Sequence, residues 1–185
     1  ALVPMGLTLL AATLTWGPVA HAQDGCIPSR PDELQLIVAE AEDFLGQGNV
    51  RESLESVSRG ESLLPCLTDS VAADNLGALF LVKGAALYRL GSKGRRDAEG
   101  AFRQAFVYDS EQVCDLRGLV SGAKSVCERA KGQVSDETLV EFDLINHHSG
   151  ALVYVDGRRV KPERRGLIDV ELVSGTHYLQ VLSDD

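Results

Sequence analysis

The chain has 185 residues, 44% of them hydrophobic and 24% charged, and 27 acidic against 18 basic side chains give a net charge of −9. This length fits one or two small globular domains and excludes a large multidomain enzyme. An isoelectric point near 4.9 argues against a nucleic-acid-binding protein, which needs a dominant basic face to neutralise phosphates. The sequence therefore indicates an architecture and a compartment more readily than a reaction.

The N-terminus is typical of a secretory signal peptide. Residues 1–22 contain no Asp, Glu, Lys or Arg, and their apolar run is interrupted by Gly17-Pro18 and ends in Ala20-His21-Ala22. We expect cleavage after Ala22 and an exported chain, periplasmic or associated with the cell envelope, without a membrane span. The alternatives are an uncleaved anchor, for which the run is short, and a lipoprotein signal at Gly25-Cys26. We also expect the chain to begin upstream of residue 1.

Export makes disulfides the expected state of the four cysteines, which are Cys26, Cys66, Cys114 and Cys127. Three pairings are open to them. If residues 32–46 and 50–64 form an antiparallel helical hairpin, Cys26 and Cys66 flank two neighbouring helix ends, which favours Cys26–Cys66 together with Cys114–Cys127. A Cys-x-x-Cys pair is absent, so the spacing supports neither a redox motif nor a zinc site. The alternative is four buried free thiols.

Helical periodicity dominates residues 29–132. Apolar side chains recur every three or four residues from Leu34 to Leu45, which predicts an amphipathic helix over 32–46. The same reasoning predicts further helices over 50–64, 68–90 and 97–107. Breaks between them are marked by Gly, Asn and Pro.

Two stretches of this segment resemble the tetratricopeptide repeat, a two-helix unit of about 34 residues. The first is carried by Ile37, Ala41, Phe44, Gly48, Ser53, Val57, Gly60 and Pro65, and the second by Phe80, Gly84, Leu87, Ala98, Phe102, Ala105 and Ser110. Small residues in this pattern let paired helices approach closely, and aromatic residues fill the gaps. The resemblance implies a tetratricopeptide-like domain over residues 23–132 that binds a partner protein. The alternative is a four- or five-helix bundle.

The polar face of the first two predicted helices is rich in carboxylates. Among them, Glu40, Asp43 and Glu55 are candidate partner-binding residues in an acidic groove for a basic peptide. The alternative is an ordinary solvated helix face.

After residue 132 the pattern changes to alternation. Residues 139–145, 151–155, 167–173 and 177–182 predict four short strands, and Asp156-Gly157 is a strong hairpin signal. We therefore expect an α+β chain of two domains, in which residues 133–185 form a small antiparallel, sandwich-like β domain.

The β segment resembles the PEGA domain, a small envelope module. The resemblance is carried by Gly150 to Gly157, by Pro162 and by the stretch from Leu172 to Val181. It implies a PEGA-like domain over residues 133–185 that anchors or extends an assembly in the bacterial cell envelope. We expect further residues to follow downstream.

All five basic residues of the β segment lie in one predicted loop, as Arg158, Arg159, Lys161, Arg164 and Arg165. They are candidates for contact with an anionic lipid, a glycan or an acidic partner. The alternatives are docking on the acidic helical domain of the same chain and an ordinary soluble turn. Together with Tyr154, these residues would carry a cell-wall or surface-glycan binding function.

A catalytic constellation is absent from the sequence. The histidines that follow the signal peptide, His147, His148 and His177, have no neighbours at a metal-ligand spacing. A Gly-x-Ser-x-Gly elbow and a phosphate-binding loop are also missing. We expect no catalytic residues, metal or cofactor, and we predict a non-catalytic interaction or scaffold protein with a protein partner. The alternative function is a glycan-binding module.

Overall fold

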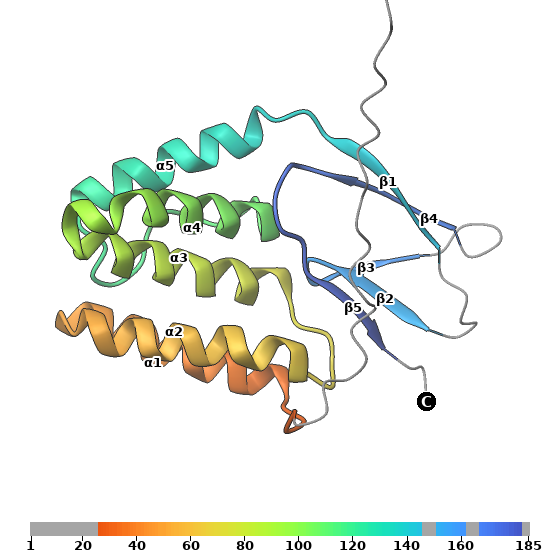
Figure 1. Ribbon diagram of the computed structural model, residues 1–185, viewed down its shortest axis with the longest axis horizontal. Coiled ribbons are helices and arrows are strands. Elements are labelled where there is room, and N and C mark those ends of the chain that lie inside the picture. The colour runs from red at the N-terminus through yellow and green to blue at the C-terminus, as the bar shows by residue number, and fades with distance from the viewer. Residues whose placement is uncertain (1–25, 146–150, 162–166, 183–185) are drawn as a thin grey trace, which may run out of the picture.

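A computed structural model describes residues 26–145, 151–161 and 167–182, in which five α-helices precede five β-strands. The helices are α1 (Pro31–Gln47), α2 (Val50–Leu63), α3 (Ala73–Arg89), α4 (Arg95–Tyr108) and α5 (Ser121–Ser135). The strands are β1 (Val140–Ile145), β2 (Leu152–Val155), β3 (Arg158–Val160), β4 (Leu167–Leu172) and β5 (Leu179–Leu182). In Figure 1 the helices lie side by side at one end and the strands gather at the other. The chain is therefore α+β, with a helical part up to Ser135 and a β part from Val140.

The first helix shows why the sequence folds locally as it does. Its buried side chains, Leu34, Val38, Ala41 and Leu45, recur at helical spacing, and Pro31 occupies the first turn, where its missing N–H costs nothing. The helix ends at Gly48, whose φ of 87° is left-handed and whose N–H bonds to the carbonyl of Leu45. The predicted hairpin over 32–46 and 50–64 is confirmed to within one residue at each end.

The helices build up in sequence order. Each one packs against the next, α3 lies against both α1 and α2, and α5 lies against both α3 and α4. A helix lying on a preceding helical pair is thus an arrangement that occurs twice. The largest fully buried side chains of this packing are Phe102, Phe106, Leu34, Leu45, Leu76 and Leu79.

Close packing between α3 and α4 depends on a glycine. A Cβ atom placed on Gly84 would come within 2.6 Å of the Phe102 ring, so the ring fills space that any side chain at position 84 would take. Gly60 plays a similar role in α2, where a Cβ atom would lie 2.8 Å from Leu79. Both contacts show small residues letting helices approach closely, with an aromatic ring filling the space beside Gly84 and aliphatic side chains filling the space beside Gly60.

Two disulfides hold the helical part together, and both predicted pairings are confirmed. Cys26 is bonded to Cys66, with their Cα atoms 5.4 Å apart, and Cys114 to Cys127, at 5.9 Å. The first joins the start of α1 to the end of α2, where Ser29 and Leu67 also form a short parallel bridge. Because disulfides form and persist in oxidising environments, both bridges fit an oxidising compartment.

The structure corrects two helix predictions. The helix expected over 68–90 begins only at Ala73, because the backbone before it bonds elsewhere: Thr68 N–H donates to the Ser29 carbonyl and Val71 N–H to the Gln180 side chain. Helix α5 was not predicted. Its buried residues are the small side chains Ala123, Cys127, Ala130 and Val134, which give a weak periodic signal.

The described residues of the β part form five strands in two antiparallel sheets, where four strands in a sandwich-like domain were expected. β1 pairs with β4, and the second sheet has the order β3-β2-β5. The additional strand, β3, lies in the predicted basic loop, because the hairpin at Asp156-Gly157 returns the chain at once alongside β2. Both turn residues have positive φ, 50° and 75°, as a two-residue type I′ hairpin requires. The hairpin itself is confirmed.

The segment from Ser174 to Gln180, which we call the docking segment, attaches the β part to the helical part through alternate residues. Ser174 bonds to Arg103, Thr176 to Gln104, and the Tyr178 hydroxyl donates to the Leu64 carbonyl. Gln180 is buried and bonds to the backbone of Asp69 and Val71. Thr176 makes its contacts through its backbone N–H and carbonyl. Ser174 accepts from Arg103 through its carbonyl and hydroxyl, and Tyr178 and Gln180 bond through their side chains.

Within the described residues, no helix combines the length and the apolar composition that crossing a membrane requires.

Candidate functional site

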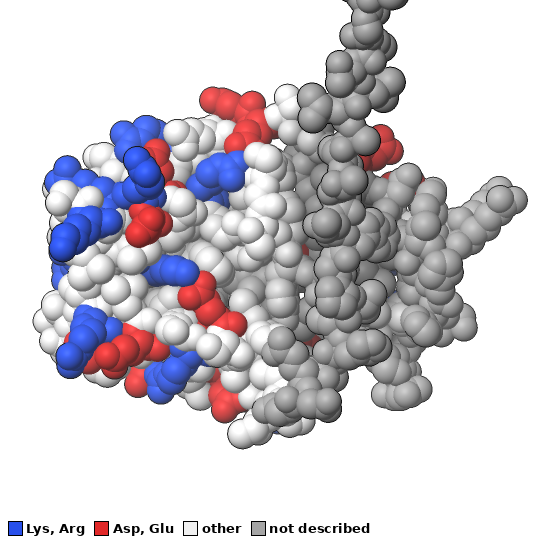
Figure 2. All heavy atoms as spheres, viewed as in Figure 1, with Lys and Arg blue, Asp and Glu red and all other residues white. Residues whose placement is uncertain are grey.

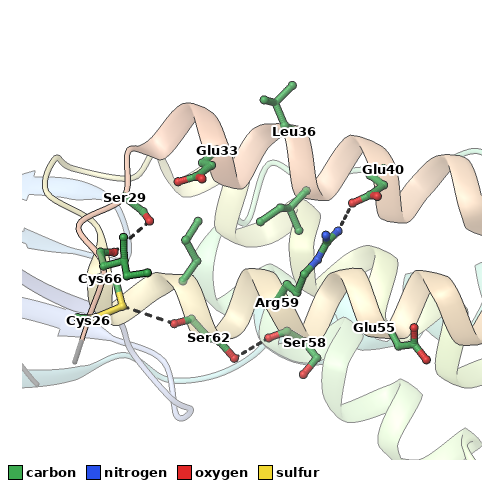
Figure 3. Close-up of a pocket in the computed structure, with 13 residues that line it drawn as sticks. Cys26, Ser29, Glu33, Leu36, Glu40, Glu55, Ser58, Arg59, Ser62 and Cys66 are labelled. Carbon is green, nitrogen blue, oxygen red and sulfur yellow. Dashed lines mark hydrogen bonds and ion pairs between the residues drawn. A yellow bond between two sulfur atoms is a disulfide. The ribbon is translucent and has the colours of Figure 1, made fainter. Parts of the chain in front are cut away.

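An open groove of about 930 Å³ runs between α1 and α2, on the side turned away from the buried residues of both helices (Figure 3). The Cys26–Cys66 disulfide closes one end. From α1 the groove is lined by Glu33, Leu36, Ile37 and Glu40, and from α2 by Glu55, Ser58, Arg59, Ser62 and Leu63. A smaller hollow of about 250 Å³ shares Glu40, Glu55 and Arg59 and continues the groove to Phe44 and Glu52.

Two large apolar side chains stand at this groove in contact with solvent. Leu36 is 70% exposed and Ile27 is 80% exposed, the highest values among the exposed large hydrophobic residues of the described chain. Figure 3 shows Leu36 standing out from α1 at the rim. Ile37 and Leu63, which are half-buried, also line the groove. Neighbouring exposed apolar side chains beside a hollow are typical of an interaction surface.

The three predicted acidic residues do not form one site. Glu40 and Glu55 line the groove, whereas Asp43 lies outside it and pairs with Arg117 at 2.9 Å. Arg59 crosses from α2 to pair with Glu40, as Figure 3 shows. Glu55 lies 3.6 Å from Arg51. Each of the three carboxylates therefore has a basic partner within the chain.

Figure 2 gives the same result for a whole face of the molecule. Lys and Arg side chains alternate with Asp and Glu over the helices, and no single sign dominates the visible surface. Mixed charge of this kind is typical of a solvated face. A site on the helical part is therefore distinguished by its apolar residues rather than by acidity alone.

The predicted basic cluster is divided by the structure. Arg158 reaches the helical part, where its guanidinium lies 3.7 Å from Asp109, which favours the docking alternative for this residue. Arg159 and Lys161 are exposed, and Tyr154 is half-buried on β2. The predictions for Arg164 and Arg165 lie outside the described residues.

A histidine and an aspartate meet where the docking segment passes the β2–β3 turn. His177 Nδ1 lies 2.6 Å from Asp156 Oδ2, and its Nε2 donates to the Val173 carbonyl at 2.8 Å. In a nucleophile-activating pair, that second nitrogen would face a hydroxyl or thiol. Here it faces backbone, so His177 fixes the turn to the docking segment. The predictions for His147 and His148 lie outside the described residues.

Burial and polar contacts shift three pKa values at the junction between the helical part and the β part. Hydrogen bonds from Arg103 and Ser174 hold the pKa of the Glu137 carboxyl below its usual value. Burial raises the pKa of Tyr178 to about 12, and the neighbouring Tyr108 adds to the effect. Burial and the Asp156 charge likewise raise the pKa of Tyr108 to about 12. The junction thus favours ionised Glu137 and neutral tyrosines.

A cavity of about 340 Å³ between α5, α4 and the β part is lined by Glu137 and by the pair Asp156 and His177. Three of its charged residues already have partners: Glu137 accepts a hydrogen bond from Ser174, Lys131 donates to the Gln112 carbonyl, and Arg158 lies beside Asp109. Throughout the described chain, every buried side-chain nitrogen and oxygen has a hydrogen-bond partner. The described residues also hold no group of three His, Cys, Asp or Glu side chains that fits a metal ion.

The groove contains residues that the sequence reasoning missed. Leu36 was passed over because it falls outside the helical spacing of the core positions, two residues after the buried Leu34. Ile27 lies between a cysteine and a proline, where no periodicity operates. An apolar residue on the polar face of an amphipathic helix is the signal that would have found Leu36.

Comparisons with protein-family models, with curated proteins and with solved structures each give no match to this chain.

Proposed function

We propose that this chain is an exported, non-catalytic interaction protein of the bacterial cell envelope, whose helical part binds a partner protein. The observation that carries the proposal is the groove between α1 and α2, beside which Leu36 and Ile27 remain 70% and 80% exposed. Leaving two such side chains in water is unfavourable, and a partner that covers them gains the free energy of their burial.

Two further observations support the proposal. Both disulfides fit an oxidising compartment, as export requires. The tetratricopeptide-like pattern is typical of helical arrays that bind other proteins, and it remains a prediction.

The β part has a separate role in this proposal, which rests on its resemblance to the PEGA domain. It extends the assembly as part of one body with the helices, because Tyr178 and Gln180 bond directly to backbone between Leu64 and Val71. A partner held in the groove would then keep a defined position relative to the β part.

In-cell crosslinking tests the function. A photo-crosslinking amino acid replaces Leu36 in the mature chain in its native envelope, and a matched chain carries it at Leu90, which is 52% exposed at the end of α3. We expect a protein crosslinked at position 36 and not at position 90, identified by mass spectrometry. The proposal is overturned if no protein crosslinks at position 36 and the chain instead sediments with purified cell wall, the result expected of a glycan-binding module.

A further inference from the structure

The groove between α1 and α2 lies on the outer side of a pair of antiparallel helices. Elsewhere in the helical part, such a pair has a third helix packed on it. α3 lies on the pair α1–α2 from the inner side, and α5 lies on the pair α3–α4. In both cases a single helix packs against two neighbouring ones. The outer side of α1–α2 offers the same pair of antiparallel helices with nothing comparable packed on it among the described elements.

The dimensions of the groove suit a helix. Its lining on α1 extends from Glu33 to Phe44, which corresponds to about 16 Å at a rise of 1.5 Å per residue. A helix of about three turns spans that length, and its apolar stripe would cover Leu36, Ile37 and Leu63. Ile27 and the Cys26–Cys66 disulfide define where such a helix would end.

The charged residues of the groove indicate which kind of helix can bind there. Four carboxylates line it, from Glu33, Glu40, Glu52 and Glu55, and the single cation in the lining, Arg59, already pairs with Glu40. Outside the lining, Arg51 lies near both Glu52 and Glu55. Glu33 has no ion-pair partner among the described residues. The groove is therefore acidic beside its apolar strip.

That charge disfavours two occupants from the chain itself. A second copy stacked through the same face would bring its own carboxylates against these, and like charges in contact are unfavourable. The N-terminal residues 1–25 contain no Lys or Arg to complement the groove.

We infer that the groove binds a single amphipathic helix of a partner protein, with an apolar stripe flanked by Lys or Arg. This inference rests on the proposed function and deepens it by naming the chemistry of the partner. The apolar stripe packs on Leu36 and Ile37 between α1 and α2, and the basic flank lies beside Glu33 and Glu55.

The test uses the mature chain with the photo-crosslinking amino acid at position 36, combined with charge reversal. Glu33→Lys places a cation at the rim without breaking an ion pair of the described structure. Glu128→Lys makes the same charge change at an exposed position of α5, away from the groove. We expect the crosslinked partner segment to show helical apolar spacing with flanking Lys or Arg. Glu33→Lys should lower the crosslinking yield about threefold or more, and Glu128→Lys should leave it unchanged.

A second measurement uses purified protein and two synthetic peptides of about 18 residues, a length at which an isolated helix begins to be populated. Both carry the same Leu pattern, one with Lys and one with Glu at the polar positions. We expect only the Lys peptide to bind, more weakly as salt increases, and Leu36→Ser to reduce its binding where Leu90→Ser does not.

The outcomes separate the inference from the function it rests on. A partner captured at position 36 through a segment without basic residues, through a second copy of this chain, or with a yield unaffected by Glu33→Lys overturns the inference and leaves the interaction function intact. Absence of any protein at position 36 overturns both.

Discussion

The helical part and the β part of this molecule are stabilised in different ways. The helices enclose a continuous core that includes Phe102 and Phe106, and two disulfides close it. Among the β-part residues whose burial the structure describes, the buried apolar side chains are Val153, Val155 and Ile168. Val173 and Tyr178 of the β part pack instead on the helical core. A sheet region this small depends on what it is docked against, so the helical part is the source of much of its stability.

The strongest test of this difference is a truncation in the helical core. Phe102 is fully buried against α3, so Phe102→Ala leaves a cavity where the ring stood, and we expect the free energy of unfolding to fall by about 3–5 kcal/mol. The β part should lose its structure in the same transition. Urea unfolding followed by circular dichroism measures both. Phe44→Ala, at a half-buried position, serves as the control and should cost clearly less. A β part that persists after the helices unfold would contradict the dependence.

The disulfides come next in expected effect. Replacing Cys26 and Cys66 by serine opens a loop of 40 residues, and replacing Cys114 and Cys127 opens one of 13. In the chain-entropy model, the losses are about 4 and about 3 kcal/mol at most. Thermal unfolding of the two double variants shows which disulfide contributes more stability. The prediction is wrong if loss of Cys114–Cys127, which closes the shorter loop, destabilises the protein more.

Breaking one attachment should affect the β part selectively. Gln180→Ala leaves the buried Val71 N–H without its acceptor, which costs about 1–3 kcal/mol. Because this bond holds the docking segment, amide hydrogen exchange should accelerate in β5 and β2 while α1 and α2 keep their protection. Gln133→Ala, at an exposed position of α5, should leave exchange unchanged. If amide exchange accelerated equally throughout the chain, the β part would not be opening independently of the helical part.

Acid should weaken the same junction through Glu137. Since contacts with Arg103 and Ser174 lower its pKa on folding, the carboxylate contributes stability above its ordinary pKa of 4.5, and this contribution is lost as the pH falls through the lower folded value. We expect Glu137→Gln to destabilise the protein at neutral pH and to have little effect in strong acid. Urea unfolding at a series of pH values measures this. Glu128→Gln is the matched control, and a pH-independent effect of Glu137→Gln would refute the linkage.

The smallest expected effect lies at alkaline pH. The fold raises the pKa of Tyr178 from 10 to about 12, so it favours the neutral phenol, and the associated stability is present below pH 10 and lost as the pH rises toward 12. In an ultraviolet titration, Tyr178→Phe should remove one phenol from the phase near pH 12. Loss of a phenol from an earlier phase would place Tyr178 in water rather than against Leu64.

Sequence reasoning reached the local features of this fold. The hairpin from Pro31 to Leu63 follows from apolar spacing, and the two disulfides follow from that hairpin, because antiparallel helices place Cys26 beside Cys66. The Asp156-Gly157 turn was equally local, since positive φ at two consecutive positions limits the choice of residues.

What the sequence did not reveal depends on distant contacts. The start of α3 at Ala73 is set by Val71 bonding to Gln180, which lies 109 residues further along the chain and shares no local pattern with it. The sequence predicted only some residues of the candidate groove: its carboxylates Glu40 and Glu55 were predicted as binding residues, but Leu36 was not. The repeat-like pattern also does not predict which face of the helical array remains exposed to solvent, because that exposure depends on how the helices pack together.

The long separation between Val71 and Gln180 has a consequence for the order in which the molecule can assemble as it is synthesised. The hairpin α1–α2 and its Cys26–Cys66 bond involve only the first 66 residues, so they can form while the rest of the chain is still emerging. The Asp69 carbonyl and the Val71 N–H have no Gln180 side chain to bond to until β5 has been synthesised. Until then these two backbone groups can bond to water or to other chains. At that stage residues 69–71 lie next to a completed hairpin but still lack the β5 residue that bonds to them.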